Sequence, residues 1–131
     1  MIVDSSALVA VVRNEPEALA LSTALGHAIE IGIGAPTLVE TSIVLTTRVG
    51  SAGRMLLGRL LDELGVSTIP FDDRHWRVAA DAFARFGKGR HPAALNFGDC
   101  MTYATARISG WPLLCIGGDF AQTDIDLVDI R

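Results

Sequence analysis

The sequence is 131 residues long; half of its residues are hydrophobic, one fifth are charged, and its formal net charge is −4. This length predicts one domain, residues 1–131, and the acidic balance argues against a protein that coats nucleic acid through a broad basic face. No apolar run approaches the ~18 residues of a membrane-spanning helix, the start lacks a signal-peptide pattern, and the two cysteines lack metal-ligand spacing, so we expect a cytoplasmic protein.

The predicted elements alternate between strands and helices along the chain. Residues 1–3 are apolar and predict a short buried strand, and Ser5 or Ser6 is expected to cap the helix that follows. A second helix is expected to begin at Pro16 and to end near His27. The sequence then predicts, in order, strand 30–34, helix 35–49, turn 50–53, helix 54–64, strand 66–69, a helix capped by Asp72, loop 87–95, helix 98–109, strand 113–116 and an edge strand at 127–128. This alternation predicts a three-layer α/β/α sandwich with a four- to five-stranded parallel sheet.

Two acidic residues directly follow predicted strands. Asp4 comes immediately after the first strand, and Asp119 follows two glycines after the strand at 113–116. In an open parallel sheet, ligands bind just beyond the carboxyl ends of the strands. These two positions therefore predict acidic side chains at the ligand-binding edge of the sheet.

Two further acids lie near the start of predicted helices that leave the same edge. Glu40 stands three residues after Thr37, and Asp99 stands three residues after Asn96. Both spacings also fit a capping box, in which the acid binds a backbone N–H group and has no other role. Taken alone, each acid is explained equally well by capping or by function.

Four carboxylates at one edge would repel one another. Two unit charges ~4 Å apart near a protein surface repel by about 4 kcal/mol, and helix N-termini offset only about 0.3–1 kcal/mol each. A divalent cation removes this conflict, and an all-carboxylate set favours Mg²⁺ or Mn²⁺ over zinc. Such a site is suited to hydrolysis of phosphodiester bonds.

Four motifs in this order resemble those of the PIN-domain ribonucleases and, more closely, of the VapC toxins of bacterial toxin–antitoxin pairs. The resemblance covers essentially the whole chain. The motifs are residues 2–8 (IVDSSAL), Glu40 after Ala35-Pro36, residues 97–100 (FGDC) and residues 118–124 (GDFAQTD).

The resemblance implies a Mg²⁺- or Mn²⁺-dependent endoribonuclease that cuts structured RNA such as tRNA or rRNA. It also implies a homodimer that a small VapB-like antitoxin inhibits, with operator DNA bound only through the antitoxin. By the same match Asp4, Glu40, Asp99 and Asp119 form the catalytic acidic cluster. Asp4 and Asp99 are the expected direct metal ligands, Glu40 and Asp119 are expected to act through water, and Ser6 is expected to orient Asp4 by a hydrogen bond.

A short basic run precedes Asp99. Arg85, Lys88 and Arg90 lie within six residues and contain no acid between them. A run of this kind is either a solvated loop or a set of contacts to RNA phosphates. We keep both interpretations for these three residues.

Apolar helix faces give weaker signals. In the helix after Asp72, the predicted inner face consists of Trp76, Ala79, Ala80 and Phe83, and His75 is expected near the surface. The leucines at 56, 57, 60, 61 and 64 form one stripe, which belongs either to the core or to a groove that receives an antitoxin helix.

A second function remains open at this point. The chain could be a non-catalytic interaction module that binds an antitoxin through its acidic groove, with the acids contacting arginines of the partner. Other hydrolase classes are excluded, because the sequence has neither a phosphate-cradling P-loop nor a Gly-x-Ser-x-Gly elbow.

Overall fold

The sheet at the centre of the fold has four parallel strands in the order β3-β2-β1-β4. The computed structural model describes residues 1–130. The strands are β1 (Ile2–Val3), β2 (Gly32–Gly34), β3 (Ser67–Ile69) and β4 (Leu113–Leu114). In the register of the sheet, Ile2 of β1 pairs with Gly32 on one side and with Leu113 on the other. The predicted parallel sheet is thus confirmed.

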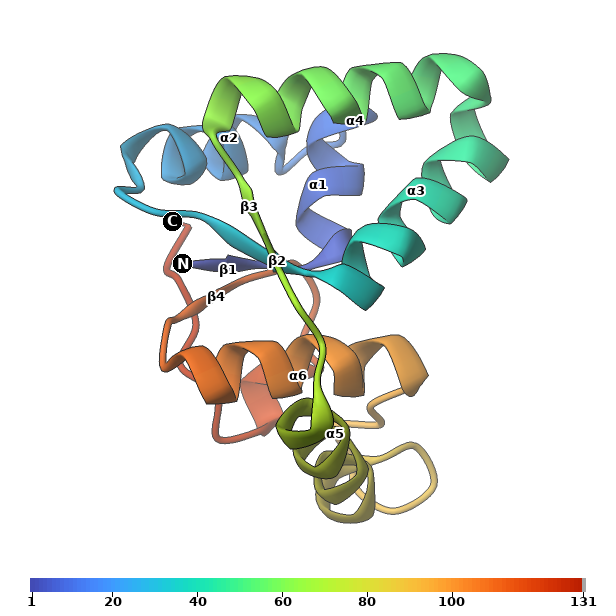
Figure 1. Ribbon diagram of the computed structural model, residues 1–131, viewed down its shortest axis with the longest axis vertical. Helices are drawn as coiled ribbons and strands as arrows, with labels where there is room; N and C mark the ends of the chain where they lie inside the picture. Colours follow the sequence, from blue (N-terminus) through green and yellow to red (C-terminus); the bar gives the residue numbers. More distant parts are fainter. Residues whose placement is uncertain (131) are drawn as a thin grey trace.

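Helices cover both faces of this sheet (Figure 1). On one face lie α1 (Ser5–Val12), α2 (Ala18–His27), α3 (Ala35–Val49) and α4 (Ser51–Leu64); on the other lie α5 (Asp73–Phe86) and α6 (Phe97–Ser109). A short 3-10 helix, η1 (Phe120–Gln122), follows β4. The three-layer α/β/α arrangement agrees with the prediction.

The two residues of β1 show how the core is divided. Successive side chains of a strand point to opposite faces of the sheet. Val3 packs in the apolar cluster with residues of α1 to α4, and Ile2 packs in a second cluster with residues of α5 and α6. Each face of the sheet therefore has its own hydrophobic core, and the carboxyl end of β1 leads through Asp4 into α1.

Several expected boundaries differ from the structure. Strands β2 and β4 are shorter than the predicted ranges 30–34 and 113–116. Helix α2 begins at Ala18, so Pro16 lies in the turn before it rather than in its first turn. No four-residue turn separates α3 from α4, because α4 begins at Ser51. Gly50 alone makes the corner, with φ 81°, a value that glycine adopts without the steric cost of a side chain. Finally, Leu127 forms a single parallel bridge with Leu113 instead of a fifth strand.

The buried face of α5 also differs from the prediction. His75 and Ala79 are buried, together with Ala82, at the spacing of one helix face. Trp76 is 50% exposed and Phe83 is 41% exposed, and Ala80 is exposed as well. Small alanines let α5 pack closely on α6, which leaves the larger rings at the margin of the contact. Among residues 1–130, the structure contains no helix with the length and apolar character needed to cross a bilayer.

Candidate functional site

Asp4 connects β1 to α1, and its side chain caps the N-terminus of α1. Its Oδ2 atom accepts hydrogen bonds from the backbone N–H of Ser6 (3.1 Å) and from the Ser6 hydroxyl (2.6 Å). The N-cap is therefore Asp4, not Ser5 or Ser6 as expected, because the extended residue that leaves the strand already carries a suitable acceptor. Asp4 is only 4% exposed, so a buried carboxylate stands at the edge of the sheet.

The predicted hydrogen bond from Ser6 to Asp4 is present, and Ser6 makes a second contact. Its Oγ atom accepts a hydrogen bond from the backbone N–H of Ile116 (3.2 Å). Ser6 consequently links the carboxylate of Asp4 to the segment that follows β4. This segment continues to Asp119, which is exposed and immediately precedes η1.

Glu40 projects from α3 toward the start of α1. Its Oε1 atom accepts a hydrogen bond from the Ser5 hydroxyl (2.8 Å). The capping-box interpretation of Glu40 is wrong, because α3 is capped at Gly34 without a side-chain hydrogen bond. Thr37, the expected partner in that box, is instead within hydrogen-bond distance of Thr102 in α6.

Asp99 does form a capping box at the start of α6. Its Oδ2 atom accepts a hydrogen bond from the backbone N–H of Asn96 (3.0 Å), and its own N–H donates to Asn96 Oδ1 (2.8 Å). The capping interpretation is correct here, but it uses only one of the two carboxylate oxygens. Among the described residues, Asp99 Oδ1 has no hydrogen-bond partner, so capping and a second role are compatible.

The electrostatic environment of Asp99 shows that the four acids share one region. Partial burial, together with the negative charges of Asp4, Asp119 and Glu40, raises the pKa of Asp99 to about 6, although the Asn96 N–H acts in the opposite direction. The thiol of Cys115 has a similar environment. Burial, reinforced by Asp4, Asp99 and Asp119, raises its pKa to about 12.

Glu40 also touches the first turn of α6. A Cβ atom added to Gly98 would collide with the Glu40 carboxylate. The absence of a side chain at Gly98 thus lets Glu40 lie directly against the helix that carries Asp99. Asp4, Glu40, Asp99 and Asp119 arrive at this region from four segments far apart in the sequence.

Comparisons with known proteins decide the family. A model of the PIN domain matches residues 1–126. The chain is 50% identical over 127 residues to ribonuclease VapC36 of Mycobacterium tuberculosis, covering 96% of this chain and 91% of that protein. The chain belongs to the PIN-domain family, with the VapC ribonucleases.

Two solved structures share the fold of this PIN domain. One is VapC20 of M. tuberculosis, described as a Sarcin-Ricin loop cleaving toxin, with a TM-score of 0.80 and 18% identity over 97% of both chains. The other is VapBC2 from Rickettsia felis bound to a DNA fragment from its promoter, with a TM-score of 0.75 and 11% identity over 98% of this chain and 96% of that one. At these identities the likeness concerns the fold alone.

The acidic side chains of the PIN domain are not gathered into a closed metal cage. Within residues 1–130, no three His, Cys, Asp or Glu side chains stand close enough together to hold an ion without moving. The available donors are carboxylate oxygens, which suit a hard divalent ion that keeps several of its own waters. Burial and, to a smaller extent, the neighbouring carboxylates raise the pKa of Asp99, and the all-oxygen donor set fits such an ion.

The three basic residues of the PIN domain have different surroundings. Arg85 is held within the protein, since its guanidinium lies 3.1 Å from Asp124 Oδ2 and 3.7 Å from Asp81 Oδ2. Lys88 and Arg90 are exposed in the following turn, and no acid contacts them among the described residues. Within residues 1–130, Lys88 and Arg90 are therefore the ones of these three without an acidic partner, although the Arg90 guanidinium lies 5.7 Å from the centroid of the Phe83 ring.

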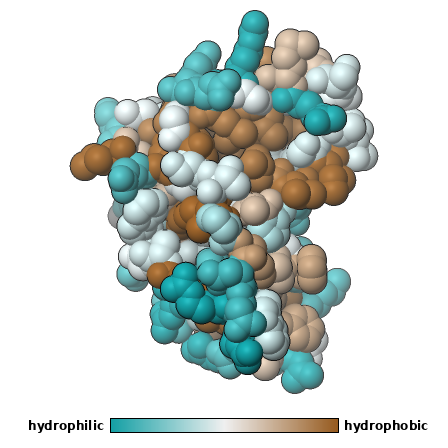
Figure 2. Space-filling view, viewed as in Figure 1, coloured by the Kyte–Doolittle hydropathy of each residue, from teal (hydrophilic) through white to brown (hydrophobic). Residues whose placement is uncertain are grey.

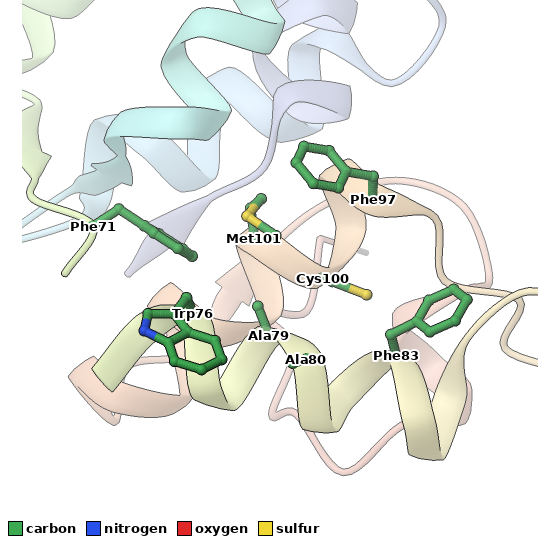
Figure 3. Close-up of a pocket in the computed structure, with 8 residues that line it drawn as sticks. All are labelled: Phe71, Trp76, Ala79, Ala80, Phe83, Phe97, Cys100 and Met101. Carbon is green, nitrogen blue, oxygen red and sulfur yellow. The ribbon is translucent and has the colours of Figure 1, made fainter. Parts of the chain in front are cut away.

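Two apolar surfaces flank the site. Figure 2 shows apolar side chains over α3 and α4, where the exposed ones include Val39, Ile43, Met55 and Leu56. Most of the leucine stripe on α4 belongs to the core: Leu57 is buried in it, and Leu60, Leu61 and Leu64 pack against it partly buried. Leu56 is exposed. The second apolar surface is a hollow of about 480 Å³ between α5 and α6. Figure 3 shows three aromatic rings at its margin, those of Trp76, Phe83 and Phe97.

Two hydroxyl groups of this region, those of Thr102 and Thr37, were not among the predicted site residues. Thr102 donates a hydrogen bond from its Oγ1 atom to Asp4 Oδ1 (2.8 Å), and Thr37 contacts Thr102. The spacing of Thr102, three residues after Asp99, places both on one face of α6 and was the available signal. Nothing in the local sequence indicates that Asp4, 98 residues away, is its partner.

Proposed function

We propose that this VapC-family protein is a Mg²⁺- or Mn²⁺-dependent endoribonuclease toxin. The observation that carries the proposal is the convergence of the acids: Glu40 binds the Ser5 hydroxyl beside Asp4 and lies against Gly98 beside Asp99. Burial and the charges of the other acids raise the pKa of Asp99, which agrees with this arrangement. A cluster of this kind, at the carboxyl ends of parallel strands, is suited to binding a cation at the ligand edge of the fold.

The acids have different roles in this proposal. Asp4 and Asp99 would hold the ion directly, and Glu40 and Asp119 would hold it through water. When bound, a divalent ion lowers the pKa of a coordinated water and offsets negative charge on a phosphate oxygen. The Ser5 hydroxyl fixes Glu40, and Ser6 fixes Asp4, so both carboxylates are oriented before RNA arrives. Lys88 and Arg90 contact phosphates of the substrate, an RNA of the tRNA or rRNA class.

Incubation of the purified protein with cellular RNA tests this function. We expect cleavage with Mg²⁺ or Mn²⁺, no cleavage with excess chelator, and a loss of about 100-fold or more in Asp99→Asn. Cleavage that survives both the chelator and this substitution would overturn the metal mechanism. Sequencing of RNA ends after induced expression then identifies the substrate and the cleavage site.

The apolar surface over α3 and α4 supports an antitoxin as partner. Exposed apolar side chains on two neighbouring helices, such as Ile43 and Leu56, suit the apolar face of an amphipathic helix. We assign this surface to a VapB-like antitoxin, through which the complex would bind operator DNA. The proposed homodimer is tested by light scattering of the toxin alone and of the complex.

If the purified toxin cleaves no RNA under any metal condition but still binds its antitoxin, the chain is a non-catalytic interaction module. In that case its acids would contact basic residues of the antitoxin instead of a metal ion. The two functions therefore give opposite results in the same cleavage experiment.

A further inference from the structure

Two buried threonine hydroxyls connect α3 and α6 to the carboxylate of Asp4. Thr102 Oγ1 lies 2.8 Å from Asp4 Oδ1, and Thr37 Oγ1 lies 3.0 Å from Thr102 Oγ1. Thr37 is 2% exposed and Thr102 is fully buried. Figure 1 shows α3 and α6 on opposite sides of the sheet, so this contact joins the two helical layers at the site.

The direction of these hydrogen bonds follows from the donors available. A carboxylate oxygen only accepts, so the single hydroxyl proton of Thr102 is directed to Asp4. The contact between the two threonines must then use the proton of Thr37, with Thr102 as acceptor. The result is a one-way chain from Thr37 through Thr102 to Asp4, in which each bond strengthens the next in a water-poor setting.

The same hydrogen bonds determine how many acceptor sites of the Asp4 carboxylate remain unoccupied. A carboxylate has about four acceptor sites, two on each oxygen. The N–H and hydroxyl of Ser6 occupy both sites of Oδ2, and Thr102 occupies one site of Oδ1. One acceptor site therefore remains, on Oδ1, and the carboxylate cannot rotate without breaking a bond to a buried partner.

We propose that Thr37 and Thr102 are positioning residues that hold Asp4 ready to bind a metal ion through a single oxygen. This inference rests on the proposed metal-dependent function. Thr102 acts directly on Asp4, and Thr37 acts by fixing the rotation of the Thr102 hydroxyl. Partners of this kind behind metal ligands contribute about 10- to 100-fold to metal affinity.

The test measures Mn²⁺ binding to the full chain without RNA, by electron paramagnetic resonance of free Mn²⁺. Thr102→Val removes the hydroxyl and keeps the shape of the side chain, and it should weaken Mn²⁺ binding by about 10- to 100-fold. Thr102→Ser restores the hydroxyl and should bind nearly as well as the natural protein. Thr37→Val should show a smaller loss, because Thr102 still contacts Asp4.

Two buried threonines supply matched controls. Thr105 lies one turn further along α6 and donates to the carbonyl of Met101 (3.1 Å), and Thr41 lies one turn further along α3 and donates to the carbonyl of Thr37 (2.7 Å). Thr105→Val and Thr41→Val lose a buried hydroxyl of the same kind without touching Asp4. Both should bind Mn²⁺ as the natural protein does.

The outcomes separate this inference from the function on which it rests. Unchanged Mn²⁺ affinity in Thr102→Val, or an equal loss in Thr105→Val, overturns the positioning role while metal-dependent cleavage stands. A natural protein that binds no Mn²⁺ and cleaves no RNA overturns the proposed function itself. If Thr102→Val does not fold, the Mn²⁺ affinity of Thr37→Val tests the positioning role instead. An affinity equal to that of the natural protein in Thr37→Val overturns the proposed chain of hydrogen bonds.

Discussion

The carboxylate of Glu40 lies against the backbone of Gly98, in the space that the Cβ atom of any other residue would fill. This contact makes a simple substitution informative. Gly98→Ala should move Glu40 away from its position beside α6, because the end of a flexible side chain gives way more easily than a helix. Since a displacement of about 1 Å can cost 10²-fold in rate, RNA cleavage should fall by about 10- to 100-fold.

Stability should change little in the same variant. Alanine is favoured over glycine in the middle of a helix by roughly 0.5–1 kcal/mol, and Gly98 is the second residue of α6, so the free energy of unfolding of Gly98→Ala should change by less than about 1 kcal/mol. Gly58 in the middle of α4 has open space around it and provides the control, since Gly58→Ala should gain helix propensity and keep full activity. Full activity in Gly98→Ala would show that the position of Glu40 does not matter.

The raised pKa of Asp99 predicts a dependence of both activity and stability on pH. The carboxylate must be ionised to hold a cation, so metal binding should rise as pH increases through about 6 and level off above it. Because the pKa is higher in the folded state than in the unfolded chain, ionisation of Asp99 opposes folding. The metal-free protein should therefore lose stability as pH rises from about 4 to about 6.

Asp99→Asn checks this prediction by thermal unfolding. Asparagine keeps an acceptor for the capping box with Asn96 and removes the charge. Without metal, the variant should melt above the natural protein at pH 7.5, and the difference should shrink toward pH 4. A variant that is equally or less stable at pH 7.5 would contradict the free-energy cost that burial and the neighbouring acids place on the ionised Asp99 carboxylate.

The basic run predicts different results for its members. Lys88→Glu and Arg90→Glu should each weaken RNA binding and reduce the slope of log affinity against log salt by about 1. Arg85→Gln should instead lower the melting temperature, because it loses the ion pairs with Asp124 and Asp81. RNA-binding titrations at several salt concentrations measure the effect of the two charge reversals. If affinity and salt dependence are unchanged in both variants, the basic run is a solvated loop without RNA contacts.

The apolar surface over α3 and α4 predicts a site for the antitoxin. Ile43 is 61% exposed on α3, and Ile43→Glu should weaken binding of a co-expressed VapB-like antitoxin by about 10-fold or more, because it places a charge in an apolar interface. Ile29 is fully exposed in the segment before β2, and Ile29→Glu is the matched control. Equal binding by both variants would place the antitoxin elsewhere.

The sequence by itself determined the element types and the acidic positions. Apolar strands alternating with helices specify a covered parallel sheet, and the placement of Asp4 directly after β1 and of Asp119 after β4 brings both to its carboxyl edge. The capping box of Asp99 fits its spacing from Asn96, but the same spacing at Thr37 and Glu40 forms no box. The local order of residues thus determines where the acids lie along the elements, and it does not decide between capping and another role.

The tertiary structure alone decided which side chains meet across elements. Whether His75 or Trp76 faces inward depends on how α5 rotates against α6, and the small alanines of the contact decide that rotation. The contacts of Glu40 with Ser5 and Gly98, and of Thr102 with Asp4, join residues 35 to 98 positions apart. Such pairs are selected by packing and sheet register together, and no local pattern along the chain encodes them.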